Sequence, residues 1–161
     1  MTTPRWLTDD EQATWRAYLW STQLFHEALD RQLQHDSGMP HAYYMILAML
    51  SEAPSHALTM SELAERTRFS PSRLSHAMRK LEGNDWVTRG RNPHCGRTIV
   101  ATLTDAGHDA LAAAAPGHVA EVRKLLLDRL TPQEAHALRD ISIKILKGLG
   151  GCAQPSRDDN G

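Results

Sequence analysis

The sequence predicts a mainly α-helical fold with a small β-wing, a winged helix-turn-helix whose N- and C-terminal helices form a dimerisation region. Three observations predict it. Capping motifs mark helix starts, two short helices follow one another in mid-chain, and two β-prone runs joined by a Gly- and Pro-containing loop come directly after them. A chain of 161 residues is long enough for one compact domain with helical arms that pair with a second copy.

Three Thr-x-x-Glu motifs, at Thr8, Thr59 and Thr131, predict helix starts. In such a capping box the hydroxyl and the carboxylate each accept a hydrogen bond from an otherwise unpaired backbone N–H. The first box opens a long helix that we expect to end near Gly38. Apolar side chains recur along it at near-helical spacing, namely Trp15, Leu19, Phe25, Leu29 and Leu33.

The middle of the chain carries the helix-turn-helix. A helix is expected from Pro40 to Ser51, then a loop over 53–56, then a short helix from the Thr59 box to about Thr67. Ser70 followed by Pro71 predicts an N-cap and a first helical residue, because the missing N–H of proline costs nothing there. That helix runs to about residue 83, with four apolar residues on one face: Leu74, Ala77, Met78 and Leu81.

Two β-prone runs, 86–89 and 98–103, predict a hairpin. Thr104 then caps a long helix to about Leu130, with a break allowed at Pro116-Gly117, and the Thr131 box opens the last helix to about Leu149. The expected organisation is a helical dimerisation region (8–36 and 118–149), a DNA-binding lobe (40–117) and a disordered tail (150–161). Two-fold pairing is the simplest way to cover apolar helical arms.

Charge is distributed unevenly along the chain. The net charge is −1, but residues 66–97 hold eight Arg or Lys residues against Glu82 and Asp85 alone. A basic block within an acidic chain indicates a local site for a polyanion. A solvated charged surface is the alternative interpretation, and the preference for arginine in one central segment favours the site.

Several segments together resemble the MarR (multiple antibiotic resistance regulator) family of winged-helix regulators. They are Met60-Ser61-Glu62-Leu63-Ala64-Glu65-Arg66, Ser70-Pro71-Ser72-Arg73-Leu74-Ser75, Arg79-Lys80-Leu81-Glu82, Trp86-Val87-Thr88-Arg89 and the V-x-x-L-T-x-x-G run from Val100 to Gly107. The resemblance covers about 15–149. It implies a homodimeric transcriptional regulator that binds double-stranded operator DNA. Family wings usually carry a D-x-R motif, and here the stretch is Cys95-Gly96-Arg97, so the Arg is present without the Asp.

A helix fits the major groove of DNA, and short polar side chains near its start reach base edges. We expect the Arg73 guanidinium to donate two hydrogen bonds to a guanine, and Arg79 and Lys80 to contact the DNA backbone. The wing would approach the minor groove or its phosphates. For Arg66, Arg68 and Arg89 a solvated or structural role is an equal alternative. The predicted DNA contacts are Ser70, Ser72, Arg73, Ser75, His76, Arg79, Lys80, Arg91, His94 and Arg97.

The resemblance also implies a small-molecule effector, since family members bind aromatic acids or phenols between the arms and the DNA lobe. Seven of the nine aromatic residues lie in the first 44. The predicted ligand-binding residues are Trp15, Arg16, Tyr18, His41 and Tyr44, with Arg16 or His41 meeting an anion. Aromatic packing in the dimer core is the alternative for each of them. The hypothesis is a repressor released from a palindromic operator by a small aromatic or anionic ligand.

The signals for other switches and other functional classes are weaker in this sequence. A thiol switch at Cys95, near His94 and Arg97, is a minority alternative, and Cys152 lies in the tail. Zinc sensing by His26, His35, His41 and His108 lacks tight ligand spacing, so no metal or cofactor is predicted. A winged helix used only for protein contacts would not need the basic helix and wing. Catalytic motifs, a signal peptide and a membrane span are missing, which predicts a cytoplasmic protein that is not an enzyme.

Overall fold

The first helix begins and ends where its caps predict. The computed structural model describes residues 4–92 and 95–150, and in it α1 spans Asp9–Ser37. The Thr8 hydroxyl accepts a hydrogen bond from the Glu11 N–H at 3.2 Å, and the Glu11 carboxylate accepts one from the Thr8 N–H at 2.8 Å. Gly38 ends the helix at φ 64°, a left-handed conformation that glycine adopts without strain.

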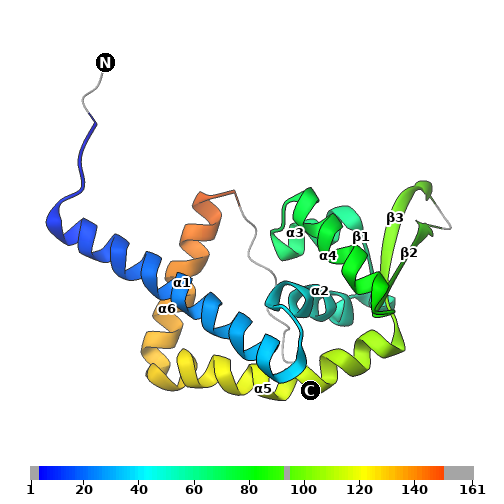
Figure 1. Ribbon diagram of the computed structural model, residues 1–161. Helices are drawn as coiled ribbons and strands as arrows, with labels where there is room; N and C mark the ends of the chain where they lie inside the picture. Colours follow the sequence, from blue (N-terminus) through cyan, green and yellow to red (C-terminus); the bar gives the residue numbers. More distant parts are fainter. Residues whose placement is uncertain (1–3, 93–94, 151–161) are drawn as a thin grey trace.

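The capping boxes at Thr59 and Thr131 also form, and the remaining elements follow the predicted order (Figure 1). The chain is a mainly helical winged helix-turn-helix, as predicted. The further helices are α2 (His41–Glu52), α3 (Met60–Thr67), α4 (Pro71–Gly83), α5 (Asp105–Leu125) and α6 (Pro132–Gly148), the strands are β1 (Ala57–Thr59), β2 (Val87–Asn92) and β3 (Cys95–Leu103), and the single-turn 3-10 helices are η1 (Pro54–His56) and η2 (Leu127–Arg129).

The wing is a three-stranded antiparallel sheet in the order β1-β3-β2. Leu58 of β1 pairs with Ala101, and Val87 of β2 pairs with Leu103. The predicted hairpin is therefore present, and both of its strands extend further than expected. The strand β1, which was not predicted, joins the lobe's helices to the sheet just before α3 begins.

Two expectations about helix ends and breaks were wrong. The helix α5 continues through Pro116 and Gly117, and it stops at Leu125 before η2 rather than at Leu130. Pro116 lies on the exposed side of the helix, where water can hydrogen-bond the carbonyl that loses its N–H partner. The predicted loop over 53–56 contains the short helix η1.

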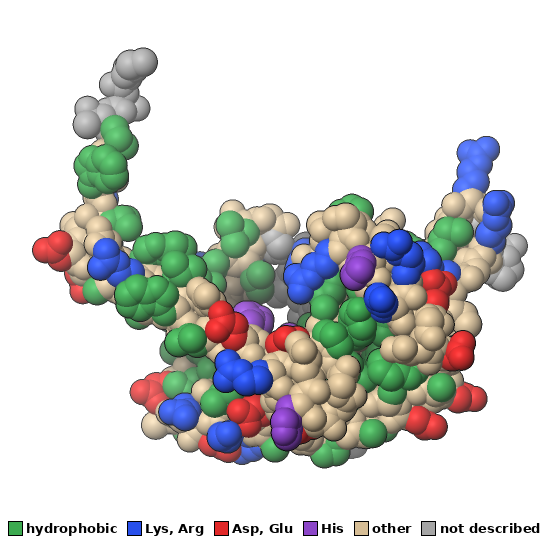
Figure 2. All heavy atoms as spheres, in the orientation of Figure 1, with side chains coloured by type: hydrophobic (Ala, Val, Ile, Leu, Met, Phe, Trp, Pro, Cys, Tyr) green, Lys and Arg blue, Asp and Glu red, His purple; other side chains and the backbone are tan. Residues whose placement is uncertain are grey.

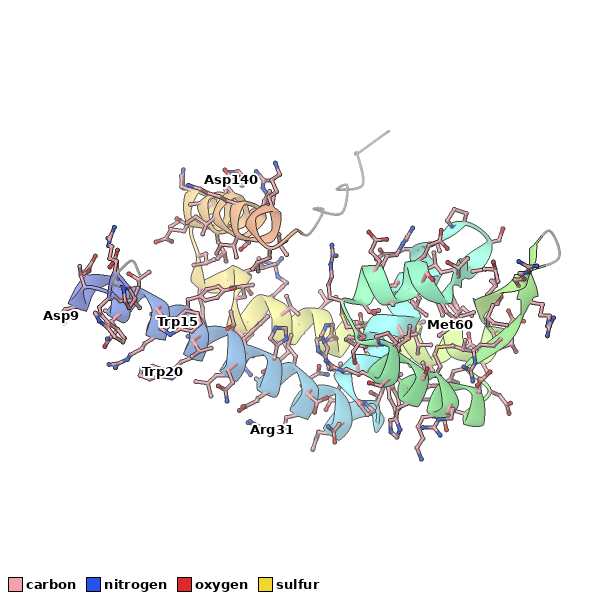
Figure 3. The ribbon with its side chains drawn as sticks, turned by 90° about the horizontal axis from the view of Figure 1, so that it is seen from above. Asp9, Trp15, Trp20, Arg31, Met60 and Asp140 are labelled. Atoms are coloured by element: carbon pink, nitrogen blue, oxygen red, sulfur yellow. The ribbon has the colours of Figure 1, made fainter. Side chains whose placement is uncertain are left out.

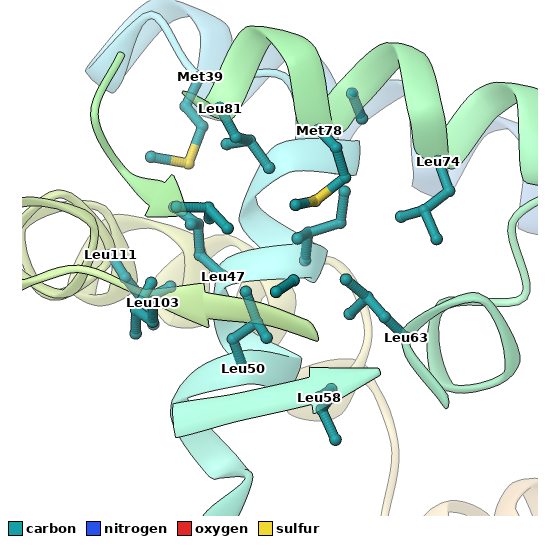
Figure 4. Close-up of a cluster of buried hydrophobic side chains, with 14 of the residues drawn as sticks. Met39, Leu47, Leu50, Leu58, Leu63, Leu74, Met78, Leu81, Leu103 and Leu111 are labelled. Carbon is teal, nitrogen blue, oxygen red and sulfur yellow. The ribbon is translucent and has the colours of Figure 1, made fainter. Parts of the chain in front are cut away.

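A single hydrophobic core holds the lobe together (Figure 4). Ile46, Leu47 and Leu50 of α2 lie at its centre and are fully buried. The apolar face of α4 packs onto them, and its members Leu74, Ala77, Met78 and Leu81 are all buried, as predicted. Because this face is fixed in the core, the opposite face of α4 is held toward solvent.

The arms leave apolar surface uncovered. Along α1 the predicted apolar stripe divides, because Leu29 and Leu33 are buried whereas Trp15 and Leu19 are exposed. The C-terminal half of α1 packs against α5, which runs beneath both the arm and the lobe (Figure 1). The helix α6 has no buried residue, and Figure 3 shows it, labelled at Asp140, standing apart from α1.

Candidate nucleic-acid interface

The first turn of α4 presents short polar side chains outward. The Ser70 hydroxyl caps the helix by accepting a hydrogen bond from the Arg73 N–H at 3.3 Å, and it lies 3.3 Å from the Ser72 hydroxyl. Ser72, Ser75 and His76 are exposed. The start of α4 therefore offers free hydroxyl and imidazole groups beside backbone N–H groups that attract an anion.

Arg73 is stacked on a neighbouring aromatic ring. Its guanidinium carbon lies 4.1 Å from the centre of the Phe69 ring, a distance typical of cation–π attraction. Among the described residues, no side chain or carbonyl accepts a hydrogen bond from this guanidinium or pairs with it. Phe69 comes from the turn between α3 and α4, and sequence reasoning did not assign it a role.

The further basic residues form a surface on the same side. Arg79 and Lys80 are exposed between the second and third turns of α4. Figure 2 shows Lys and Arg side chains gathered over α4 and along the β2–β3 hairpin. This surface combines the outward face of a helix with a basic projection, which is the shape and charge that a DNA groove and its phosphates require.

The wing carries the remaining predicted contacts. Arg97 is exposed, and the Arg91 guanidinium donates a hydrogen bond to the Gly96 carbonyl at 3.3 Å across the hairpin. His94 lies outside the described residues, so its predicted contact stays a prediction. The Asp that usually precedes the wing Arg in the family is replaced here by Cys95, whose side chain also lies outside the described part.

Arg89 has a structural partner instead. Its guanidinium donates to both carboxylate oxygens of Glu82 at 2.9 and 2.5 Å. The hydrogen bonds from Arg89 hold the pKa of Glu82 below its usual value, and the same pair raises the pKa of Arg89. This bidentate pair ties β2 to the C-terminal end of α4, so it fixes the wing relative to the helix.

A cavity of about 570 Å³ separates the arm from the start of α4. Asp30 and His41 line it from α1 and α2, and Arg73 and Phe69 line it from the helix-turn-helix. The Asp30 carboxylate accepts a hydrogen bond from the backbone N–H of His41 at 2.8 Å. The complete lining is His26, Glu27, Asp30, His41, Ala42, Met45, Thr67, Arg68, Phe69 and Arg73.

Three histidines from three helices meet at this cavity, which His26 and His41 line. The ring centroids of His26 and His41 are 6.0 Å apart, and those of His41 and His118 are 5.4 Å apart. Burial, with the neighbouring His118 and His26, lowers the pKa of His41 to about 4, and burial also lowers the pKa of His118. The buried Nδ1 of His118 has no hydrogen-bond partner among the described residues. Both rings are therefore neutral at pH 7.

Within one chain the predicted ligand residues lie in two places. His41 lines the cavity beside α4, and Tyr44 stacks 4.2 Å from His118, centroid to centroid, behind it. Trp15 and Arg16 line a different hollow of about 510 Å³, next to Trp6 near the N-terminus, and Tyr18 is exposed nearby. One copy of the chain therefore does not bring these five residues together.

The histidines of the alternative zinc switch are not arranged as a metal site within the described residues. His35 pairs with Asp36 at 2.8 Å, and the ring of His108 lies 6.3 Å from that of His56. Across residues 4–92 and 95–150, no three His, Cys, Asp or Glu side chains are arranged to hold a metal ion. Cys152 lies outside the described residues.

Known proteins share this arrangement. A MarR family profile matches residues 37–98. Rv2887, an HTH-type transcriptional repressor of Mycobacterium tuberculosis, is 36% identical over 98 residues, which are 60% of this chain and 68% of the relative. The chain belongs to the MarR family. The predicted resemblance is thereby confirmed, and the family is one of transcriptional regulators, not of enzymes.

Two solved structures extend the likeness of this MarR protein to nearly its whole length. Sco3205, a MarR family transcriptional regulator from Streptomyces coelicolor whose structure is in complex with DNA, is 46% identical, with a TM-score of 0.88 over 98% of this chain and 96% of that one. AbsC from the same organism is 37% identical, with a TM-score of 0.83 over 91% and 96%. Among the described residues of this chain, no helix is long and apolar enough to cross a bilayer.

The glycine of the MarR-like V-x-x-L-T-x-x-G run has a steric function here. A Cβ on Gly107 would stand 2.0 Å from the Trp86 carbonyl oxygen. That carbonyl accepts the Thr104 N–H at 3.1 Å, and the Thr104 hydroxyl donates to the Asp85 carbonyl at 2.6 Å. Only glycine lets the start of α5 approach the backbone that leads into β2, which sets the wing against α5.

Proposed function

We propose that this MarR family protein is a repressor that binds a palindromic DNA operator as a homodimer and is released by a small aromatic or anionic ligand. The observation that carries DNA binding is the outward polar face of α4, with the basic hairpin beside it on the same surface. Support comes from Sco3205, 46% identical over nearly the whole chain, whose structure is in complex with DNA. The relatives named as repressors support the direction of control.

Homodimerisation follows from the uncovered arms. The helix α6 exposes Leu138, Ile141 and Ile145 along one side, with Ile141 57% exposed. Trp15 and Trp20 of α1 are about half exposed as well. Several large apolar side chains exposed on one element are typical of an interface. A second copy is the occupant that supplies the same surface in return.

Two-fold symmetry then determines the form of the operator. A dimer presents two copies of α4, and two such helices enter successive major grooves when they stand about 34 Å apart. The operator is therefore expected to be an imperfect palindrome. Arg97 on each wing would contact the flanking minor groove or its phosphates.

The cavity beside α4 is where we place the effector. A ligand there would contact His41 of α2 and the start of the DNA-reading helix at once. Met45 and Phe69 provide apolar walls, and Arg68 and Arg73 provide positive charge for an anionic group. Trp15, Arg16 and Tyr18 remain predicted contributors. A ligand releases DNA only if it prefers the DNA-incompetent spacing of the two lobes, and a 100-fold preference is worth about 2.7 kcal/mol per site.

The test of DNA binding is fluorescence anisotropy with a labelled duplex from the gene's own upstream region, against a scrambled duplex of equal length. We expect the upstream duplex to bind at least 100-fold more tightly at physiological salt. Equal and weak binding to both duplexes would contradict the proposal and favour a protein-interaction module.

A further inference from the structure

We propose that Phe69 is a positioning residue for sequence recognition: its ring holds the Arg73 guanidinium at the start of α4 with its N–H donors unused. The inference rests on the proposed function, since it assigns a role to Phe69 in reading DNA. Phe69 is not one of the residues that the sequence predicts to contact DNA. Phe69 lies in the turn between α3 and α4, half-buried and packed against the core.

The geometry of the stack matters because a phenyl ring offers no hydrogen-bond acceptor of the ordinary kind. The guanidinium carbon of Arg73 lies 4.1 Å from the ring centre, so the contact restrains the position of the cation. None of the described residues accepts a hydrogen bond from that guanidinium. All of its N–H groups therefore remain available to a base edge or a phosphate.

Arg89 provides the comparison within the same lobe. Two of its N–H groups are used by the Glu82 carboxylate, at 2.9 and 2.5 Å, so Arg89 is restrained and also occupied. Carboxylates are available to Arg73 too, because Asp30 and Glu27 line the cavity on which it borders. Arg73 forms no ion pair with either of them in the described part. It is restrained by stacking alone.

Restraint before binding has a measurable consequence. A free Arg side chain loses conformational entropy when it is fixed in one geometry. A ring that already limits the guanidinium reduces that loss when Arg73 meets its base. Because the cation–π attraction at an exposed site is modest, the expected effect on discrimination is about two- to fivefold.

The experiment uses the full-length protein and a duplex selected by the wild type from a random-sequence library. Affinities are measured for this duplex and for every single base-pair variant of its half-site. Arg73→Ala identifies the base pair whose discrimination depends on Arg73. We expect Phe69→Leu to reduce discrimination at that same base pair about two- to fivefold, and Phe69→Tyr and Phe69→Trp, which keep an aromatic face, to preserve it. Tyr43→Leu removes another half-buried aromatic from the same core and should leave discrimination unchanged.

Two further readouts and one replacement variant separate positioning from packing. Phe69→Leu added to Arg73→Ala should lower discrimination no further, because the residue that Phe69 positions is already absent. Phe69→Met replaces Phe69→Leu if leucine lowers the unfolding midpoint. In the NMR spectrum of the DNA-free wild type, the Arg73 side-chain protons should be shifted upfield by the Phe69 ring current.

Each contrary outcome has its own meaning. Equal weakening of all sequences by Phe69→Leu, or loss of discrimination in Phe69→Tyr and Phe69→Trp as well, would overturn the positioning role. An Arg73 side chain without the upfield shift would overturn it without any DNA measurement. If the wild type selects no sequence from the library, the proposed function fails first, and the positioning role fails with it.

Discussion

The imidazole rings of His41 and His118 lie 5.4 Å apart, centroid to centroid, at the joint between the arm and the DNA lobe. His41 comes from α2 and His118 from the middle of α5. The ring of Tyr44 also contacts His118, at 4.2 Å between centroids. Neutral rings can pack in this arrangement, whereas a charge on one ring would be poorly solvated and would repel a charge on the other.

The packing of His41 against His118 therefore predicts that the folded protein becomes less stable as the pH falls. Burial, then His118 and His26, lower the pKa of His41 to about 4 from 6.5, while Asp30 opposes the shift and Arg73 adds to it. Between pH 6.5 and about 4 the unfolded chain binds a proton that the folded chain does not bind, so stability falls as pH falls through this window. We expect a loss of about 1 kcal/mol from His41 between pH 7 and pH 5, because solvent reaches part of the ring and screens the charge.

Urea unfolding at pH 7, 6 and 5, at one protein concentration, measures this loss. His41→Gln should flatten the pH dependence in that range. The carboxylates with lowered pKa, such as Glu62 and Glu82, lose their contribution to stability only below about pH 4.5. They therefore do not affect the comparison between pH 7 and pH 5. The same slope in His41→Gln and in the wild type would contradict the assignment to His41.

A second prediction concerns the glycine at the start of α5. Gly107→Ala would place a methyl group 2.0 Å from the Trp86 carbonyl oxygen, which forces the helix away from the wing. We expect a loss of about 3 kcal/mol in the free energy of unfolding. Gly83→Ala is the matched control, because a Cβ at Gly83 meets nothing within 4 Å and alanine favours the helix. Similar midpoints for the two variants would contradict the close approach.

Local signals explain what the sequence predicted well. All three Thr-x-x-Glu boxes formed, because each depends on four consecutive residues. The Ser70-Pro71 start of α4 is equally local, and the helix begins at Pro71 as predicted. The buried face of α4 followed from the spacing of its apolar residues.

Contacts between distant segments explain what the sequence did not predict. The strand β1 is only Ala57–Thr59, and it forms because it pairs with β3. Three residues are too few to show the alternating pattern that predicts a strand. The meeting of His41 with His118 depends on the packing of α2 against α5, whereas the sequence shows single, scattered histidines. The stack of Arg73 on Phe69 depends on the turn angle before α4, which residue types alone do not determine.

A third prediction concerns the wing. Arg97→Ala should weaken binding to many sequences alike and lower the slope of log affinity against log salt by about 1, because one phosphate contact is lost. Arg123→Ala is the control, since Arg123 lies on α5 in an ion pair with Asp128 at 2.7 Å. Anisotropy titrations between 50 and about 200 mM salt measure both slopes. An unchanged affinity and slope for Arg97→Ala would remove the wing from the DNA interface.

The fourth prediction concerns assembly. Ile141→Glu places a charge in the exposed apolar face of α6 and should convert the dimer to a monomer at micromolar concentration, because a buried unpaired carboxylate is costly. Arg139→Glu changes a charge on the polar side of the same helix and should leave the dimer intact. Light scattering distinguishes the two states. A stable wild-type monomer at this concentration would contradict the proposed interface.

The last prediction concerns the effector. Salicylate, as a small aromatic acid, should release DNA from the protein. His41→Ala should weaken this release if the ligand binds in the cavity of about 570 Å³ beside α4, which His41 and Arg73 both line. A change in tryptophan fluorescence is expected only if the ligand binds beside Trp6 and Trp15. A Trp15→Ala, Arg16→Ala double variant tests the other hollow, near the N-terminus. Loss of the response only in the double variant would move the ligand there. Release of DNA by oxidants or zinc alone would instead assign the switch to Cys95 or to the histidines.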